Sequence, residues 1–383
     1  MKKILIIHNN YRNLGGEDVA VKNEISFLKK HYEVETLFFS NKSRNLIGIL
    51  SSLVFRNNLE SNGKVKFAIN DFKPDLIYIH NTWFQASLGI FDIAKNTNIK
   101  TVVKLHNFRY FCTSYYTTSN HLNNNEICQA CGLTNSSVGK INKYFKESLI
   151  KSLAVINYGK KYLKILKNYN IHILVLTDFH KKFLINLGVD ENKITIFPNN
   201  LQLDRTYSEN DNINRDYIVY AGRISEEKGV KELIETFIES NLEDLKLKII
   251  GKGPQLDSLR EMFQNNKIEF IGEKTNKEVL DIISKSRAVI TATKLYEGQP
   301  TLLCEASSLG IPSIFPDTGG IKEFFPDNYQ LAFEQFNYKD LKNKLLQLNN
   351  QDEIKLIGKQ NYQHINEHLN KNILKKIIKG IDE

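Results

Sequence analysis

Short apolar runs alternate with segments of helical spacing along the chain, and this alternation constrains the fold more than any other feature. Runs of four to seven residues rich in Ile, Val and Leu predict buried parallel strands, which need helical crossovers between them. We therefore expect an α/β fold of doubly wound parallel sheets. The runs are 2–8, 34–39, 75–80, 101–105, 173–176 and 194–197 in the first half, and 217–221, 245–250, 268–271, 288–292 and 312–315 in the second.

The length of the chain and a polar stretch predict its domain division. With 383 residues, the chain is too long for one ordinary hydrophobic core. Pro198-Asn199-Asn200 and the polar residues 208–215 have the composition of a linker. We expect one domain over residues 1–200, a second over 201–365, and a final helix over 366–383.

Two carboxylates flank an expected helix start in the second domain. Gly298-Gln299-Pro300-Thr301 follows the run 288–292 and should open a helix near Thr301. Such a junction offers free backbone N–H groups and a positive dipole end, which suit a phosphorylated ligand. Glu297 precedes that helix and Glu305 lies about one turn inside it, so a ligand there could meet both. Alternatively, they are a surface acid and a helix-face acid that never meet.

Two cations lie on a glycine-bounded loop directly after the run 217–221. The loop reads Gly222-Arg223-Ile-Ser-Glu-Glu-Lys228-Gly229. An arginine can fork across two oxygens and a lysine supplies a point charge, so the pair suits a diphosphate.

In this order, these motifs resemble the donor half of retaining GT-B glycosyltransferases of family 4, of the bacterial cell-surface polysaccharide type. The matching patterns are G-R-x4-K-G at 222–229, E-x7-E at 297–305 and Gly-Gly-Ile-Lys-Glu at 319–323. The resemblance covers nearly the whole chain. It implies two Rossmann-like domains facing a cleft, with the C-terminal helix crossing back to the first. It also implies metal-independent transfer, with retention, from a nucleotide diphosphate sugar to a glycan or lipid-linked acceptor.

The resemblance implies roles for individual residues of the second domain. Arg223 and Lys228 would neutralise the departing diphosphate. Glu297 would hold a sugar hydroxyl and Glu305 would accept hydrogen bonds from the ribose. A double displacement with Glu297 as nucleophile is the less favoured alternative. The other donor-binding residues expected here are Gly222, Gly272, Gly298, Gln299, Pro300, Thr301 and Leu302.

In the first domain, the resemblance implies roles for a histidine and a glycine pair. A lone histidine after a strand is more often structural, but the resemblance makes His106 a sugar contact and transition-state stabiliser. Asn107 stands where the family often has Asp, which leaves a His–Asp pairing open. Gly15 and Gly16 would bring backbone close to the donor phosphate and sugar, because they lack a Cβ. A plain tight turn is the alternative.

Three cysteines lie in the long polar loop after His106. Cys128 and Cys131 have the spacing of a metal-ligand pair, with Cys112 as a third ligand. The other half of a zinc ribbon is missing, so reduced thiols are the favoured reading and a structural metal the alternative. No Asp-x-Asp triplet occurs, and we expect neither a catalytic metal nor another cofactor.

The positive charge is concentrated in the first half of the chain. Residues 1–200 carry 27 Lys and Arg against 14 Asp and Glu, a net +13, whereas residues 201–383 carry −4. No nucleic-acid-binding motif is recognisable, so an anionic membrane surface or a phosphorylated acceptor fits better. Residues 44–56, apolar with an arginine at each end, predict a segment lying on a bilayer or a core-facing helix.

Without a signal-peptide core or an apolar run long enough to span a bilayer, we expect a cytoplasmic protein at the inner face of the membrane. Two rival functions remain open: a nucleotide-sugar epimerase of the same fold, and a non-catalytic nucleotide-sugar-binding protein.

Overall fold

The chain divides into two compact units, residues 1–200 and 201–383. The computed structural model describes residues 2–10, 16–40, 51, 55, 57–108, 110, 149–199, 201 and 215–369, with the backbone alone for 149–156. Each unit contains one six-stranded sheet in which every pairing is parallel. The predicted α/β class with two doubly wound parallel sheets is confirmed.

Unit 1 has the strand order β2-β1-β3-β4-β5-β6. Ile4 to Ile7 of β1 are all almost completely buried, as expected for a central parallel strand covered on both faces. The elements are β1 (Lys3–Asn10), α1 (Gly16–Leu28), β2 (Glu33–Ser40), α3 (Leu59–Phe72), β3 (Leu76–Asn81), α4 (Gly89–Asn96), β4 (Lys100–Leu105), α7 (Leu149–Asn168), β5 (His172–Val175), α8 (Asp178–Asn186), the 3-10 turn η1 (Glu191–Lys193) and β6 (Ile194–Ile196).

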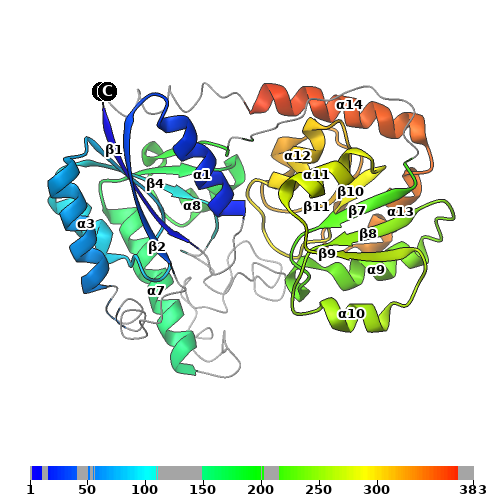
Figure 1. The fold of residues 1–383 in the computed structure, drawn as a ribbon, viewed down its shortest axis with the longest axis horizontal. Coiled ribbons are helices and arrows are strands. Elements are labelled where there is room, and N and C mark those ends of the chain that lie inside the picture. Colours follow the sequence, from blue (N-terminus) through cyan, green and yellow to red (C-terminus); the bar gives the residue numbers. More distant parts are fainter. Residues whose placement is uncertain are drawn as a thin grey trace. The chain divides into compact units, whose positions relative to one another are not determined.

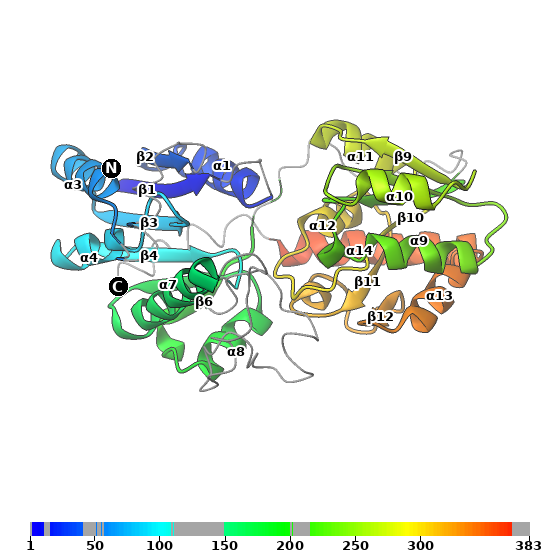
Figure 2. The same ribbon diagram turned by 90° about the horizontal axis from the view of Figure 1, so that it is seen from below.

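Unit 2 has the strand order β12-β11-β10-β7-β8-β9. Figures 1 and 2 show α11, α12 and α14 on one face of this sheet and α9, α10 and α13 on the other. The elements are β7 (Tyr217–Ala221), η2 (Glu226–Lys228), α9 (Val230–Glu239), β8 (Lys246–Ile250), α10 (Leu256–Met262), β9 (Ile268–Gly272), α11 (Asn276–Ser284), β10 (Ala288–Ile290), α12 (Thr301–Ser308), β11 (Ser313–Asp317), η3 (Ile321–Phe324), β12 (Ala332–Glu334), α13 (Tyr338–Gln347) and α14 (Gln351–His368).

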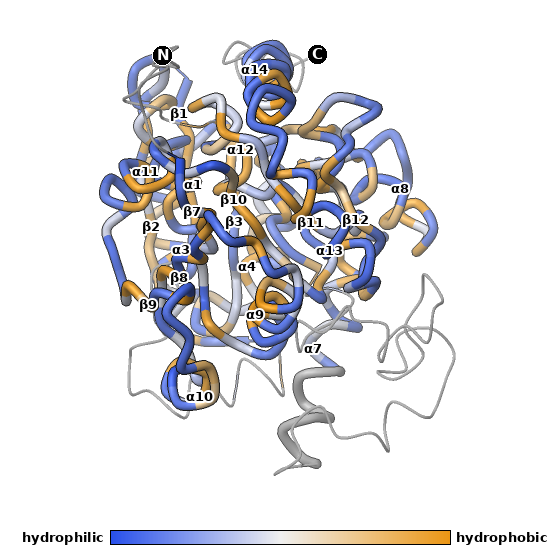
Figure 3. The backbone as a smooth tube through the Cα atoms, turned by 90° about the vertical axis from the view of Figure 1, so that its right-hand side faces the viewer, coloured by the Kyte–Doolittle hydropathy of each residue, from blue (hydrophilic) through white to orange (hydrophobic). Residues whose placement is uncertain are grey.

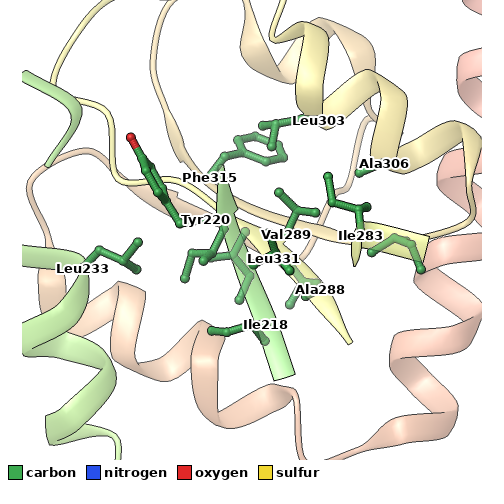
Figure 4. Close-up of a cluster of buried hydrophobic side chains, with 14 of the residues drawn as sticks. Ile218, Tyr220, Leu233, Ile283, Ala288, Val289, Leu303, Ala306, Phe315 and Leu331 are labelled. Carbon is green, nitrogen blue, oxygen red and sulfur yellow. The ribbon is translucent and has the colours of Figure 1, made fainter. Parts of the chain in front are cut away.

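The core of unit 2 explains why these segments take these places. Val289 and Phe315, from neighbouring strands, are completely buried on the side of the sheet that Leu303 of α12 covers, and Ile218 of β7 is completely buried farther from that helix (Figure 4). The helix α14 is predominantly hydrophilic (Figure 3) and buries only one stripe, spaced three and four residues apart. That stripe consists of Ile354, Ile357, Gly358, Asn361 and Ile365.

Some elements of the structure differ from those predicted from the sequence. The sequence did not predict β12, because only three residues form it and a single one, Phe333, is fully inside. The helix α14 continues through the predicted boundary at 365–366. Residues 370–383, and with them the expected return to the first domain, lie outside the described residues, as do most of residues 44–56.

The reversal of strand order in unit 2 falls between β10 and β7, which pair directly. In open parallel sheets, ligands bind at such a switch point, beyond the carboxyl ends of the strands. Here the loops that follow β7 and β10 touch through their backbones. A Cβ on Gly229, whose φ is +64°, would lie 2.1 Å from the carbonyl oxygen of Ala292. Glycine is therefore required where the two loops meet.

Replacing Gly229 by alanine should destabilise unit 2 through two additive effects. The left-handed backbone conformation costs about 1–3 kcal/mol for a residue other than glycine, and relief of the overlap with Ala292 costs roughly 1–3 kcal/mol more. Gly272→Ala is the matched control, since its φ is +83° but no atom lies within 4 Å of the added Cβ. Urea denaturation followed by circular dichroism measures both. Equal losses would show that the conformation alone, and not the loop contact, requires glycine.

Candidate functional site

Backbone hydrogen bonds fix the Arg223 loop, residues 222–229, and leave the arginine side chain exposed to solvent. The amides of Gly222 and Ile224 donate to the carbonyls of Ile250 and Lys252, both at 3.0 Å. The buried Tyr220 hydroxyl donates to the carbonyl of Arg223 at 2.7 Å. Burial, and secondarily Glu297 and Glu227, raise the pKa of Tyr220, so this phenol remains a donor. The Arg223 side chain is exposed, and within the described part of the chain no group pairs with it.

Lys228 and Glu297 form an ion pair that joins the Arg223 loop to the loop after β10. The Lys228 ammonium lies 2.5 Å from Glu297 Oε1, and each side chain is 28% exposed. The Thr293 hydroxyl donates to the same oxygen at 3.1 Å. The backbone of Glu297 is fixed as well, because its carbonyl accepts from the amide of Gly320 at 2.9 Å. Lys228 and Glu297, which the resemblance assigns to different parts of the donor, therefore also contact each other.

A second link joins the same two loops. The amide of Lys294 donates to the carbonyl of Glu227 at 2.9 Å. The ammonium of Lys294 lies 2.6 Å from a carboxylate oxygen of Glu232 on α9. The relative position of Arg223, Lys228 and Glu297 is thus set by backbone and side-chain contacts together.

As predicted, helix α12 begins at Thr301. Its N-cap residue, Pro300, makes no side-chain capping bond. Gln299 is buried, and its carbonyl accepts from the amide of Thr301 at 3.0 Å. The amides of a helix's first turn have no partner within the helix; that of Thr301 donates to Gln299, so the donors at this uncapped end are the amides that follow Thr301, at the positive end of the helix dipole.

Glu305 is buried one turn into α12, where it meets the start of α11. Asn276, the first residue of α11, donates its side-chain amide to Glu305 Oε1 at 3.3 Å. Burial raises the pKa of Glu305, and the bond from Asn276 only partly opposes that rise. The carboxylate is therefore a strong acceptor in a partly desolvated position, the property needed to recognise a ligand hydroxyl.

Gly272 ends β9 and contacts the residue that follows β8. Its carbonyl accepts from the amide of Gly251 at 2.8 Å, and the space beyond its Cα is open. Flat backbone without a side chain offers a surface against which a planar ligand group can lie.

In unit 1, His106 directly follows β4 and contacts a second histidine. Its Nε2 lies 3.1 Å from Nδ1 of His80, and the rings are stacked with centroids 5.4 Å apart. Burial, followed by the charges of neighbouring groups, lowers the pKa of both rings well below the usual range, so both are neutral. Asn107 donates its amide to Glu17 at 3.1 Å, a bond that an aspartate could not make. No His106–residue 107 pairing is needed to explain the asparagine.

The remaining predicted residues lie apart from these contacts. Gly16 opens α1, exposed and with open space beyond its Cα, whereas Gly15 lies outside the described residues. Cys112, Cys128 and Cys131 also lie outside them. Within the described ranges no group of three His, Cys, Asp or Glu could hold a metal ion. No described helix is both long and apolar enough to cross a membrane.

Three residues of the site were not predicted from the sequence: Thr293, Lys294 and Asn276. Thr293 directly follows the run 288–292, which was a usable signal. Lys294 joins the two loops through its backbone amide, which any residue provides, and Asn276 is 29 positions from Glu305 in sequence. Neither contact has a sequence signal.

Residues 205–361 match the family described as glycosyl transferases group 1. The matched range contains the Arg223 loop, the ion pair and Glu305, so this part of unit 2 is similar to glycosyl transferases group 1.

Curated relatives carry glycosyltransferase names. The chain is 27% identical over 169 residues to an uncharacterized glycosyltransferase of Methanocaldococcus jannaschii, covering 43% of this chain and 46% of that protein. It is 33% identical over 116 residues to a putative teichuronic acid biosynthesis glycosyltransferase of Bacillus subtilis, covering 30% and 28%. The matches to these two relatives thus span less than half of the relatives' own lengths.

Solved structures share the fold of the whole chain. Sucrose-phosphate synthase from Thermosynechococcus elongatus superposes with a TM-score of 0.73 at 12% identity, covering 100% of this chain and 98% of that one. Anabaena HepE, solved with UDP and glucose, superposes with a TM-score of 0.66 at 13% identity, covering 99% and 100%. Both units therefore have the GT-B fold that was predicted.

Removing Lys228 and Glu297 singly and together should reveal a coupling of about 1 kcal/mol in the stability of unit 2. The pair is mostly shielded from water, so its attraction is screened less than on an open surface. The variants are Lys228→Met, Glu297→Gln and the double variant, compared by urea denaturation. Lys252 and Glu273 form the control pair at 2.7 Å, with side chains 58% and 61% exposed, and should show little coupling. Equal coupling in both pairs would contradict this account.

Glu305→Gln should be more stable than the unsubstituted protein at pH 7. The pKa of Glu305 is higher in the folded protein than in the unfolded chain, where it is about 4.3. The free energy of unfolding therefore falls as the pH rises from the unfolded pKa through the folded pKa. Glutamine keeps the acceptor for Asn276 and has no such loss, so the gain should vanish below about pH 4. Melting temperatures across this range measure it.

Glu278→Gln should change stability in the opposite direction, because hydrogen bonds from Thr275 lower the pKa of Glu278 in the capping box of α11. It should be less stable than the unsubstituted protein at pH 7. A gain for both variants would indicate a general charge effect instead of burial at Glu305.

Proposed function

We propose that this chain is a retaining, metal-independent glycosyltransferase that moves a sugar from a nucleotide diphosphate sugar to a glycan or lipid-linked acceptor. The observation that carries the proposal is the switch point of unit 2. There, an arginine without a partner among the described residues, a lysine paired with a carboxylate and an uncapped helix end lie on the loops of two directly paired strands. Anionic ligands are attracted to fixed positive groups of this kind.

The donor is proposed to bind along these loops. Arg223, Lys228 and the first amides of α12 bind the diphosphate, while Glu305 accepts hydrogen bonds from ribose hydroxyls. The base lies against the backbone at Gly272. The HepE structure, solved with UDP and glucose, supports a UDP-linked hexose as the first donor to test.

Lys228 is suited to two partners at once. Its ammonium has three donors, and in the structure Glu297 and the loop geometry orient it. One N–H group therefore remains directed by Glu297 while others bind a phosphate oxygen. Glu297 keeps its second carboxylate oxygen for a sugar hydroxyl. This shared use accounts for both predicted roles without separating the ion pair.

In the proposed reaction, the bond between the anomeric carbon and the diphosphate oxygen breaks first. The acceptor hydroxyl forms the new bond on the same face of the sugar, and its proton goes to the departing phosphate oxygen. Negative charge grows on the diphosphate as the bond breaks, so fixed cations stabilise the transition state more than the ground state. His106 contacts the sugar. The resemblance to retaining family 4 enzymes supports retention.

The proposed acceptor belongs to cell-surface polysaccharide assembly. The Bacillus subtilis relative is named for teichuronic acid biosynthesis, and a Saccharomyces cerevisiae relative, 25% identical over 191 residues, is named a phosphatidylinositol N-acetylglucosaminyltransferase subunit. These names support testing both a glycan and a lipid-linked acceptor. The net charge of +13 in residues 1–200 supports a cytoplasmic position at an anionic membrane surface.

Arg223→Gln should lower kcat by about a hundredfold with a smaller change in KM, because the guanidinium acts on charge that develops as the donor bond breaks. Transfer is measured with radiolabelled UDP-glucose and a lipid-linked acceptor fraction. Lys246→Met is the matched control, since this exposed lysine pairs with Glu269 at the opposite, amino end of β8. It should retain full activity.

The same assay with EDTA tests metal independence, which predicts unchanged rates. Full activity of Arg223→Gln would exclude the proposed diphosphate site. Release of the free nucleotide without an acceptor, or epimerisation of the donor, would favour the rival enzyme over a transferase.

A further inference from the structure

A group of buried polar side chains in unit 1 ends at His106. Glu24 of α1, Lys104 of β4 and the side chain of His80 on β3 are all completely shielded from water. Tyr78, also on β3, is almost fully buried and contacts both Glu24 and the ring of His80. Sheet interiors rarely contain such groups unless each is matched to a partner.

Glu24 is the centre of this group. Lys104 forms an ion pair with Oε1, and the Tyr78 hydroxyl donates to Oε2 at 2.8 Å. The Lys104 ammonium also lies 4.2 Å from the centre of the Phe197 ring. Burial lowers the pKa of Lys104 while Glu24 raises it, so each charge depends on the other. The carboxylate is thereby fixed in position and presents Oε2 toward β3.

His80 connects this carboxylate to His106. Its Nε2 makes no hydrogen bond within the described residues but lies 3.8 Å from Glu24 Oε2, and its Nδ1 lies 3.1 Å from Nε2 of His106. A neutral imidazole has one N–H and one lone pair. A lone pair on Nε2 would face the negative oxygen, whereas an N–H there is attracted to it. The proton of His80 is therefore favoured at Nε2, which makes its Nδ1 an acceptor.

The same reasoning then applies to His106. Since Nδ1 of His80 accepts, Nε2 of His106 must donate, and Nδ1 of His106 carries the lone pair. That Nδ1 is buried and has no hydrogen-bond partner within the described residues. An unsatisfied buried acceptor is costly, so a donor from a ligand is favoured there.

We propose that His80 is a positioning residue, which with Glu24 fixes the tautomer of His106 so that Nδ1 of His106 accepts a hydrogen bond from a hydroxyl of the bound sugar. The sugar part of this statement rests on the proposed function, and the tautomer part does not. The low pKa values of both rings agree with it, because burial, together with Lys104 and His8 near both rings and His180 near His106, keeps the imidazoles neutral.

Two variants of His80 distinguish its hydrogen bond to His106 from its packing in the core. An asparagine amide reaches the place of Nδ1 in histidine, and a glutamine amide reaches the place of Nε2. His80→Asn therefore keeps an acceptor for His106, whereas His80→Gln keeps a group beside Glu24 and removes that acceptor. Both replace a buried ring by an amide, so their losses of stability should be similar.

The tautomer is measured without substrate by nitrogen NMR of protein labelled with ¹⁵N-histidine, with the His106 signals assigned by their loss in His106→Asn. We expect a protonated Nε2 and an unprotonated Nδ1 for His106 in the unsubstituted protein and in His80→Asn. In His80→Gln, the Nδ1-protonated form should appear. A protonated Nδ1 in the unsubstituted protein, or no change in His80→Gln, would overturn the proposal, and the first result needs no variant to fold.

Transfer assays test whether His80 affects catalysis through His106. His80→Gln should lower kcat at least tenfold at comparable melting temperature, while His80→Asn retains most of it. Equal losses in both variants would mean that His80 acts only through packing. If no protein transfers sugar, the unsubstituted one included, the proposed function fails, and the NMR result still decides the role of His80.

Discussion

The ion pair between Lys228 and Glu297 is the side-chain contact that joins the two charged loops of unit 2 directly. It joins loops from β7 and β10, the two strands between which the strand order reverses. At that place both loops leave the same edge of the sheet, and the ion pair adds a side-chain contact to the backbone bond between Lys294 and Glu227. A pair with side chains 28% exposed is partly desolvated yet still reachable by a ligand. It therefore fixes the lysine before any ligand arrives, which reduces the reorganisation that charge stabilisation would otherwise require.

The close approach of these loops has a backbone cause. Gly229 lets the Arg223 loop approach the carbonyl of Ala292. Gly319 likewise lies against the backbone of Glu297, because a Cβ on Gly319 would be 2.3 Å from the Glu297 carbonyl oxygen. Side chains at either position would separate the strand ends. The glycines of both motifs thus serve to bring the charged residues together as well as to turn the chain. This explains why the glycines and the charged residues occur in one motif.

The sequence predicted the sheets well because buried parallel strands are continuous apolar runs, readable without knowing their neighbours. It also singled out Lys228 and Glu297 individually. Their contact was not predicted, since it depends on β7 and β10 being adjacent, a fact of strand order and not of local pattern. The bond between Asn276 and Glu305 and the contact of His80 with His106 were missed for the same reason. Asn107 is the instructive case: its amide serves Glu17, a partner 90 positions away.

The two units use buried charge in different ways. In unit 1, Glu24 and Lys104 are completely buried, so removing one would leave the other uncompensated in a low-dielectric interior. Such a pair cannot exchange partners with a ligand, but it can orient a neutral neighbour, as Glu24 does for His80. In unit 2, Lys228 is only partly buried and Arg223 is exposed without a partner among the described residues, so both can accept an anion. The degree of burial thus separates groups that orient neutral side chains from groups able to bind charge directly.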